Sequence, residues 1–344
     1  MKVIRLVLFA ALLCMGCTPL HGSTDGEWTN RLGEPLVVIS APSILDAYYA
    51  EVFADIIAYD IGFADRVMGR DNIIILADAG TMPHFVGKVP DDVLLQADLG
   101  DIWIRDFSPL SPANPVKFVY APNYLDRRSS REIDDSFRAF VQRSGLEFPT
   151  ADLVVDGGNF VHNGADKAVL TERVLSDNPG KTIQEIESTL KDALGLSEIA
   201  FIPEQAGDTT GHSDGMVMWI SEKVLLVNEY DEPFRSRVHS ALDKALSDVT
   251  IIEVPDAYVP SVWKGFVSAC GIFVNALVTR DHIYVPTLAE DSDPDIVGII
   301  RANTDKEVVA VDASGVCHMG GSVRCLSWQV WGEAADRLVR LGRE

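Results

Sequence analysis

The regular alternation of two apolar patterns constrains this chain more than any other feature of its sequence. Short runs rich in β-branched and aromatic residues, bounded by Gly, Pro, Asp or Asn, predict strands. Stretches between them have apolar residues at helical spacing and predict amphipathic helices. Strand pairs and helices alternate about five times, and no linker or low-complexity run divides them. The pattern therefore predicts one α/β domain built from repeated strand–helix units.

The predicted strands and helices are distributed along the chain from residue 36 to residue 342. Strands are expected at 36–40, 72–78, 101–107, 117–122, 153–163, 167–172, 199–203, 216–221, 223–230, 250–255, 271–279, 282–288, 307–313 and 322–328. Helices are expected at 43–58, 130–144, 182–194, 233–247, 294–302 and 331–342. The third of these helices is the clearest, because a Thr stands near its start and Gly195 can cap its end.

The N-terminal segment predicts export from the cytoplasm. Residues 1–17 have a basic start, a short apolar centre and a small residue before the end, which is the layout of a secretory signal peptide. Cys17 after Gly16 also resembles a bacterial lipoprotein cleavage site, so this cysteine is either lost or lipidated as a membrane tether. Residues 18–34 are expected to form an exposed leader, and residues 35–344 a single folded domain. The expected location is periplasmic, extracellular or membrane-anchored.

The chain is strongly acidic, with a net charge of −22. Such a charge argues against a nucleic-acid partner, whose phosphates would be repelled. It permits attraction of cationic substrates, although a solubility or salt adaptation explains the charge equally well. No phosphate-binding loop or dinucleotide glycine motif occurs in the sequence.

Polar residues interrupt the apolar runs at four places, and each needs a reason because strands bury alternate positions. These residues are Arg105 and Asp106 in 98–110, Asp156 and Asn159 in 154–164, His212 and Asp214 in 207–220, and Cys325 in 318–328. Taken singly, they are explained by an ion pair, a hairpin turn, a capped loop and a packed thiol. Taken together, they supply a nucleophile, an acid/base and several carboxylates. This set predicts a cysteine-based enzyme that acts on a cation, since paired carboxylates bind a planar guanidinium.

The cysteine count leaves the state of Cys325 open. Beyond the signal, Cys270, Cys317 and Cys325 remain, so at least one thiol is unpaired unless it pairs between molecules. A Cys317–Cys325 disulfide is the alternative to a free nucleophile, and it would inactivate such an enzyme. The spacing around His318 does not fit a structural zinc site, and we expect no metal.

Five motifs occur in a recognisable order. They are Trp103-x-Arg105-Asp106, Asp156-Gly157-Gly158-Asn159, Gly211-His212-x-Asp214, Asn275 eleven residues before Pro286, and Gly320-Gly321-x-Val323-x-Cys325. This order resembles the agmatine deiminase / Porphyromonas-type peptidylarginine deiminase family, from about residue 36 to residue 330. Two positions depart from the family pattern: Asp156 stands where Glu is common, and Arg324 stands where His often precedes the cysteine.

The resemblance implies both a fold and a reaction. The fold is a pentein α/β-propeller, with five ββαβ-like modules in pseudo-fivefold symmetry around a central acidic pocket. The reaction is hydrolysis of a guanidino group to a ureido group and ammonia, through a covalent Cys thiouronium intermediate and with no required metal or organic cofactor. A Cys270–Cys317 bridge, or no bridge, suits this reaction better than one that includes Cys325. The oligomeric state is not predicted.

The resemblance also assigns roles to residues. Cys325 is the expected nucleophile and His212 the expected acid/base, while Asp106 and Asp214 are expected to bind the guanidinium nitrogens. The residues expected to bind substrate around them are Asn275, Trp103, Asp156 and Asn159.

The substrate is predicted less sharply than the reaction. In the peptidylarginine branch of the family, arginines after the first aspartate motif contact the carboxylate of a C-terminal arginine, and Arg128 is the candidate in this chain. The alternative is a solvated basic loop ahead of a helix. We expect arginine in peptides, with agmatine, which would give N-carbamoylputrescine, as the alternative. A non-catalytic exported guanidine-binding lipoprotein and, more remotely, a cysteine peptidase or amidase are the other hypotheses.

Overall fold

The computed structural model of the chain describes residues 29–288 and 294–344. The predicted signal at 1–17 and the lipidation predicted at Cys17 lie outside the described residues, as does most of the predicted leader at 18–34. No helix within the described ranges is long and apolar enough to cross a lipid bilayer.

The described end of the predicted leader is only partly exposed. The side chain of Asn30 is fully buried. Its Nδ2 donates to the carbonyl oxygen of Ile73 at 2.9 Å, and its Oδ1 accepts from the Ile73 N–H at 2.8 Å. The prediction of an exposed leader is therefore wrong at this residue, because its amide satisfies a backbone donor and acceptor at a strand.

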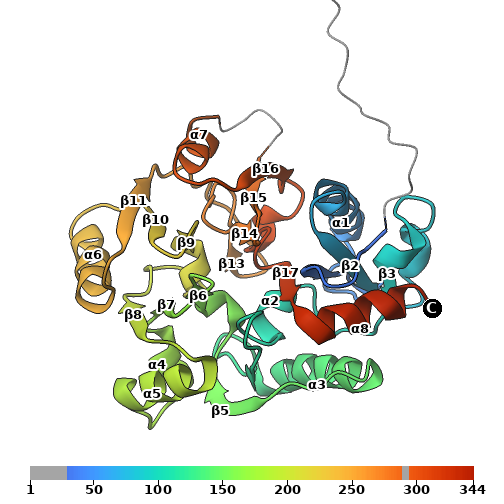
Figure 1. Cartoon of the computed structure of the whole chain (residues 1–344), viewed down its shortest axis with the longest axis horizontal. Helices are drawn as coiled ribbons and strands as arrows, with labels where there is room; N and C mark the ends of the chain where they lie inside the picture. Colours follow the sequence, from blue (N-terminus) through green and yellow to red (C-terminus); the bar gives the residue numbers. More distant parts are fainter. Residues whose placement is uncertain (1–28, 289–293) are drawn as a thin grey trace, which may run out of the picture.

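Five modules surround a common centre (Figure 1). In each module a helix connects two strands that pair in parallel, as parallel pairing requires a crossover of this kind. Four modules also have an inner strand that pairs antiparallel with the first of the two. The second module has instead a single antiparallel bridge between Leu110 and Val116. The helices lie on the outside of the ring, and the inner strands lie near its middle.

The bounds of the module elements, in chain order, are as follows. The strand–helix–strand units are β1 (Leu36–Ser40), α1 (Phe53–Val67) and β2 (Asn72–Ala77); β4 (Lys117–Val119), α3 (Arg127–Arg143) and β5 (Thr150–Val154); β7 (Lys167–Thr171), α5 (Ile183–Leu194) and β8 (Glu198–Ile202); β10 (Val224–Asn228), α6 (Phe234–Ala245) and β11 (Thr250–Val254); and β15 (His282–Thr287), α7 (Pro294–Ala302) and β16 (Glu307–Asp312). The inner strands are β6 (Val161–His162), β9 (Val217–Trp219), β14 (Leu277–Val278) and β17 (Ser327–Val330).

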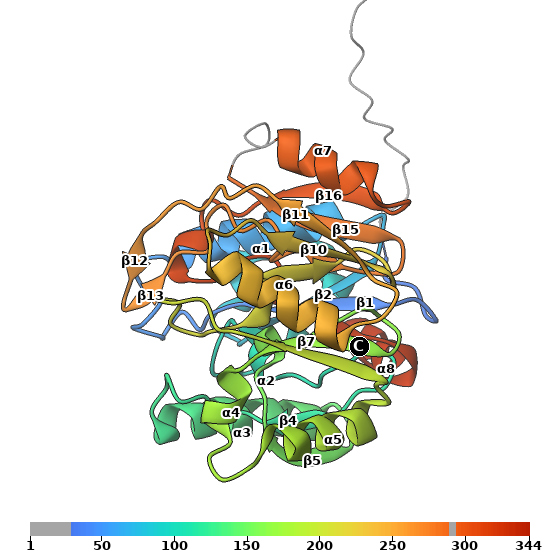
Figure 2. The same cartoon turned by 90° about the vertical axis from the view of Figure 1, so that its left-hand side faces the viewer.

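The remaining elements connect or flank the modules. They are η1 (Met82–His84), η2 (Asp91–Val93), β3 (Leu94–Gln96), α2 (Ile104–Phe107), η3 (Gly157–Asn159), α4 (Arg173–Asp177), η4 (Ser213–Gly215), β12 (Val262–Trp263), β13 (Phe266–Val267), η5 (Cys317–Met319) and α8 (Gly332–Gly342). The short hairpin β12–β13 projects at one edge of the molecule, on the side that faces away from the viewer in Figure 1 (Figure 2).

The last strand closes the ring. β17 pairs antiparallel with β1, with Leu36 opposite Val330, so the C-terminal strand becomes the inner strand of the first module. Cys325 lies two residues before β17. Ring closure therefore places the candidate nucleophile at the centre of the molecule.

The hydrophobic cores lie between neighbouring modules, and α5 shows how the sequence specifies one helix that packs in such a core. The Thr182 hydroxyl and the Glu185 side chain form a capping box, and Gly195 ends the helix in the left-handed conformation with φ of 72°. Ile186 and Leu190 are fully buried and pack in a cluster with strand residues of β4 and β5 as well as of β7 and β8. Burial of an aliphatic side chain of this size contributes roughly 2 kcal/mol.

The alternation of strands and helices predicted from the sequence is confirmed, but two predicted strands around site residues are wrong. Residues 101–107 contain the helical turn α2 rather than a strand. The predicted strand at 322–328 begins only at Ser327, so Cys325 lies in a turn. Both runs are apolar because protein surrounds them on all sides, and a short apolar run of that kind has no periodicity that distinguishes strand from turn.

The observed bounds of other elements also differ from the predicted ones. The predicted strand at 153–163 is divided into β5, η3 and β6, with Gly157 and Gly158 in the break. The helix predicted at 43–58 in fact spans Phe53–Val67. The extended chain assumed at His212 is followed directly by the 3₁₀ turn η4.

Candidate active site

The candidate site is built from one irregular segment of each module. The segments are α2 with Asp106, η3 after Asp156, η4 with His212 and Asp214, the loop before β14 with Asn275, and the turn before β17 with Cys325. Each segment directly precedes an inner strand, or the bridge at Leu110 that replaces one. The pseudo-fivefold arrangement thus converts five separate motifs into one constellation.

Four of these segments, all except the one with Asp156 and η3, contribute lining residues to the central cavity, which has a volume of about 590 Å³. Six of the predicted site residues line it: Trp103, Asp106, His212, Asp214, Asn275 and Cys325. The structure therefore brings together the nucleophile, the acid/base and both guanidinium-binding carboxylates that the sequence predicts.

Cys325 is buried and unpaired. Its Sγ lies 3.2 Å from Nδ2 of Asn275 and 3.7 Å from Oδ2 of Asp214. The Cys325 N–H donates to Oδ1 of Asn275 at 3.4 Å, so this amide contacts both the backbone and the sulfur. Burial, with the negative charges of Asp214 and Asp106, raises the pKa of the Cys325 thiol well above its usual range. The group is therefore a thiol until a cation enters the cavity.

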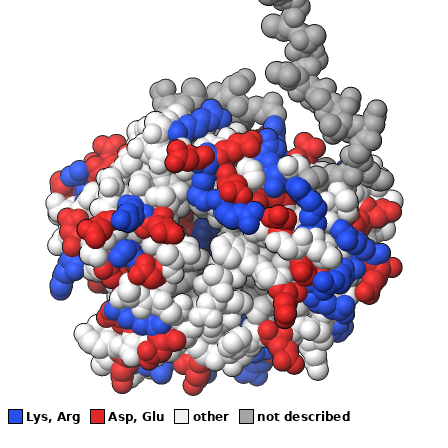
Figure 3. Space-filling view, viewed as in Figure 1, with Lys and Arg blue, Asp and Glu red and all other residues white. Residues whose placement is uncertain are grey.

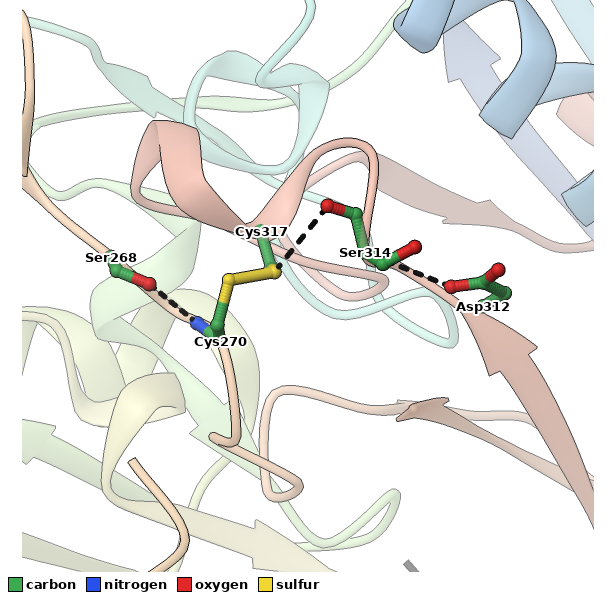
Figure 4. The surroundings of a disulfide bond; sticks show 5 residues. All are labelled: Ser268, Cys270, Asp312, Ser314 and Cys317. Atoms are coloured by element: carbon green, nitrogen blue, oxygen red, sulfur yellow. Dashed lines mark hydrogen bonds between the residues drawn. A yellow bond between two sulfur atoms is a disulfide. The ribbon is translucent and has the colours of Figure 1, made fainter. Parts of the chain in front are cut away.

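The alternative pairing of Cys325 is wrong. Cys317 instead forms a disulfide with Cys270 (Figure 4). Ser268 contacts the backbone of Cys270, and this segment lines the central cavity, as does Met319 at the end of η5. The disulfide therefore joins two segments of the cavity wall and leaves the nucleophile free.

His212 lies between two carboxylates. Its Nε2 is 3.2 Å from Oδ2 of Asp156, and its Nδ1 is 3.8 Å from Oδ1 of Asp106. Burial alone would lower the pKa of His212, but the charge of Asp106 and the hydrogen bond to Asp156 outweigh it and raise the pKa to about 10. At neutral pH the ring is an imidazolium that can donate a proton.

Asp106 is held by a close backbone contact. The N–H of Gly158 donates to Oδ1 of Asp106 at 2.9 Å. A Cβ at Gly158 would lie 2.3 Å from Nδ1 of His212 and 2.7 Å from Oδ1 of Asp106, so only glycine fits. Burial raises the pKa of Asp106 to about 7, opposed by His212 and assisted by the charges of Asp156 and Asp214.

Arg324 supports the floor of the site. One of its guanidinium nitrogens donates to Oδ2 of Asp214 at 2.8 Å and to the carbonyl of Gly157 at 3.2 Å, and the other donates to the carbonyl of Phe160 at 2.6 Å. The ion pair with Arg324 holds one carboxylate oxygen of Asp214 in place. In the sequence, Arg324 stands out only as a departure from the family pattern; its position beside the nucleophile is the signal that it belongs to the site.

Three residues predicted to bind substrate do not line the central cavity. Asp156 contacts His212 and accepts a hydrogen bond from the Tyr124 hydroxyl at 2.9 Å. The Oδ1 of Asn159 accepts from the Thr171 N–H and hydroxyl and from the backbone behind the site. Arg128 lies exposed on α3, where it pairs with Glu132.

Tyr124 lines the cavity but was not found from the sequence. Its hydroxyl holds Asp156, and its ring packs edge-on against His212 with 5.9 Å between the ring centroids. An aromatic residue in a loop has no periodicity or motif that would identify such a role.

Residues 37–330 match the model of the Porphyromonas-type peptidyl-arginine deiminase family. The chain belongs to this family. An agmatine deiminase of Pseudomonas aeruginosa is 23% identical over 327 residues, which cover 77% of this chain and 84% of the relative. The solved agmatine deiminase of C. jejuni has a TM-score of 0.71 at 19% identity, over 89% of this chain and 95% of the other. That of Enterococcus faecalis has a TM-score of 0.69 at 16% identity, over 89% and 96%.

The predicted family and the predicted pentein fold are thereby confirmed. The protein is a guanidino-group deiminase, a hydrolase that acts on the C–N bonds of amidines. This reaction requires a thiol, an imidazolium and paired carboxylates, and these groups lie together at the centre of the fold.

Proposed function

We propose that the substrate is agmatine or a close analogue: a guanidine whose other end carries a second positive charge. The observation that carries this proposal is the charge of the central cavity. Among the described residues, its lining includes six aspartates and one lysine, and no arginine. A substrate with a carboxylate, such as free arginine or a C-terminal arginine, would meet repulsion there.

The carboxylates form two groups within the cavity. Asp106 and Asp214 lie beside Cys325, where the guanidinium would bind. The lining has four other aspartates, which would face the distal end of the substrate: Asp46, Asp101, Asp126 and Asp208. A distal ammonium group is therefore favoured by the same cavity that binds the guanidinium.

The one lysine in this lining does not offset its charge. Nζ of Lys264 lies 3.2 Å from Oε1 of Glu51 and above the rings of Tyr48 and Trp263, at 4.7 and 4.5 Å from their centroids. Its charge is already shared with a carboxylate and two aromatic faces.

Arginine within a peptide is the second candidate, because of the space around the cavity mouth. Cavity-lining Tyr48 and Tyr258 are partly exposed, and Val259 and Val262 beside them expose apolar surface. An internal arginine has no free carboxylate, so the acidic lining does not exclude it. Arg128, the residue predicted to recognise a C-terminal carboxylate, lies outside this lining.

The proposed reaction begins when the guanidinium binds between Asp106 and Asp214. The added positive charge favours the Cys325 thiolate, and Oδ2 of Asp214, at 3.7 Å, is the nearby acceptor for the thiol proton. The sulfur then bonds to the central carbon of the guanidinium. The amide of Asn275, at 3.2 Å from Sγ, orients the thiolate toward that carbon.

His212 serves both halves of the reaction. It donates its proton to one terminal nitrogen as the C–N bond breaks, and ammonia leaves a covalent thiouronium on Cys325. The neutral imidazole then takes a proton from water, which attacks the same carbon. The C–S bond then breaks, the proton of the added hydroxyl group passes to solvent, and Cys325 leaves as thiolate, which takes its own proton back from Asp214. The product carries a ureido group.

We also propose that the enzyme works outside the cytoplasm. The signal predicted at 1–17 supports this location, and so does the Cys270–Cys317 disulfide, since such bonds persist in oxidising compartments.

A ureido assay on the purified chain tests the substrate proposal. Agmatine, free arginine, a peptide with internal arginine and a peptide ending in arginine are compared, beside a Cys325→Ala control. We expect kcat/KM for agmatine to exceed that for free arginine by about tenfold or more, which corresponds to about 1.4 kcal/mol. Preference for either carboxylate-bearing substrate would contradict the proposal, and preference for the internal arginine would select the second candidate.

A further inference from the structure

A second cavity lies on the opposite side of the catalytic residues, and its volume is about 320 Å³. Its walls come from the inner strands β6, β9, β14 and β17 and the residues that follow them. Arg105 and Arg324 line this cavity, while the next residues in the chain, Asp106 and Cys325, line the central one. Residues that are adjacent in the chain thus line two different cavities, one on each side of the catalytic residues.

This second cavity, the basic cavity, is rich in positive charge. Besides the two buried arginines, Arg280 and Lys306 line it, and Glu222 is the single carboxylate residue among its described lining residues. The face seen in Figure 1 is the one away from the β12–β13 hairpin. Figure 3 shows that face with Lys and Arg side chains within and around a hollow near its middle.

Arg105 is a buried cation in the wall of the basic cavity. Its Nε donates to the carbonyl of Arg324 at 3.3 Å, but it forms no ion pair with a carboxylate in 29–288 or 294–344. Burial and the neighbouring charge of Arg324, opposed by the charges of Asp214 and Asp106, lower the pKa of Arg105 to about 9, which leaves it cationic at neutral pH. A buried cation without an anion is costly, and a bound anion would remove that cost.

Donors without partners surround the same cavity. The indole N–H groups of Trp219 and Trp331 are buried and have no hydrogen-bond partner within the described part of the chain, and both residues line the basic cavity. Trp219 is 3% exposed. Nδ1 of His162 accepts from the Gly164 N–H at 3.1 Å, so the ring proton lies on Nε2 as a further donor.

We propose that the basic cavity binds a small oxyanion, a phosphate or a carboxylate, between the Arg105 guanidinium and the two indole N–H groups. Cations and neutral donors line this cavity, and Glu222 is its single carboxylate residue among the described lining residues. Arg324 lines the basic cavity and also pairs with Asp214, so one guanidinium connects the anion site to the catalytic site. This inference does not depend on the identity of the guanidine substrate.

Isothermal titration of the full chain tests the proposal. Inorganic phosphate, sulfate and acetate are titrated separately, with sodium chloride added to keep the ionic strength constant. The variants are Trp331→Phe, which keeps an aromatic ring but removes the indole N–H, and Lys306→Gln, which removes a charge. Trp263→Phe is the matched control, because its indole bonds to Glu51 outside the basic cavity.

We expect saturable binding of one anion per chain, weakened about tenfold by Trp331→Phe and also by Lys306→Gln, but not by the control. Saturating agmatine should not displace the anion. A stronger response to phosphate would identify a phosphoryl-bearing ligand, and a stronger response to acetate a carboxylate. No saturable binding, equal affinity in both cavity variants and the wild type, or displacement by agmatine would overturn the proposal.

Discussion

Removal of the Cys270–Cys317 disulfide should destabilise the fold by an amount that follows from its position. The bridge closes a loop of 47 residues between two segments of the cavity wall. Cross-linking a loop of that length restricts the unfolded chain and is expected to contribute about 4 kcal/mol at 25 °C. The double variant Cys270→Ala/Cys317→Ala should therefore lose about 4 kcal/mol of unfolding free energy.

Equilibrium urea unfolding, followed by tryptophan fluorescence, measures this loss. Thiol reduction of the wild-type chain should give a loss of similar size without removing any atoms from the core. The matched control is Cys325→Ala, whose thiol is free and whose substitution leaves the loop closed. A loss below about 1 kcal/mol in both the double variant and the reduced wild type would refute the reasoning.

Three further predictions concern the catalytic residues. Gly158→Ala should lower kcat/KM about 100-fold, because the added Cβ would displace His212 and Asp106. The control Gly62→Ala, with open space around it, should leave kcat/KM nearly unchanged, and equal activities of the two variants would contradict the close contact. Asp106 attracts a guanidinium only in its ionised form, and its pKa is about 7, so kcat/KM should fall as pH drops through that value; a profile flat down to pH of about 5 would contradict this. Asp156→Asn should lower the pKa of His212, as an NMR titration of its ring protons would show, and an unchanged pKa would exclude the contact as its cause.

The alternation of strands and helices could be predicted because each element has its own local signal. The helix α5 has a capping box, an amphipathic face and a glycine end, and its predicted bounds match to within a residue. β1 was predicted without error, because its apolar run is bounded by turn residues. Such signals depend on neighbours in sequence, so no partner from elsewhere in the chain is needed to interpret them.

The local structure of the site could not be predicted for the opposite reason. Asp106 and Cys325 lie in turns whose apolar neighbours are buried by other modules, and the sequence pattern around them imitates a strand. The order of motifs identified which residues belong together, but not what each contacts. Arg128 shows this limit: its position after the first motif suggested a role in binding, yet its side chain pairs with Glu132 on the surface.

Polar residues inside apolar runs were nevertheless the correct place to look. Asp214 is buried because Arg324 neutralises one of its oxygens, and no spacing rule connects two residues that lie 110 positions apart. Tyr124, in the loop between β4 and α3, likewise contacts Asp156, which follows β5. Contacts of this kind depend on ring closure, which only the folded chain provides.

The most direct test of the proposed chemistry is the detection of a covalent intermediate on Cys325. The full chain is mixed with agmatine, quenched with acid within a turnover and measured by intact-protein mass spectrometry, with Cys325→Ser as the control. We expect a mass increase equal to agmatine less ammonia, located on the peptide that contains Cys325 and absent from the control. Rapid turnover with no adduct in the wild type, or the same turnover in Cys325→Ser, would contradict the role of this cysteine as nucleophile.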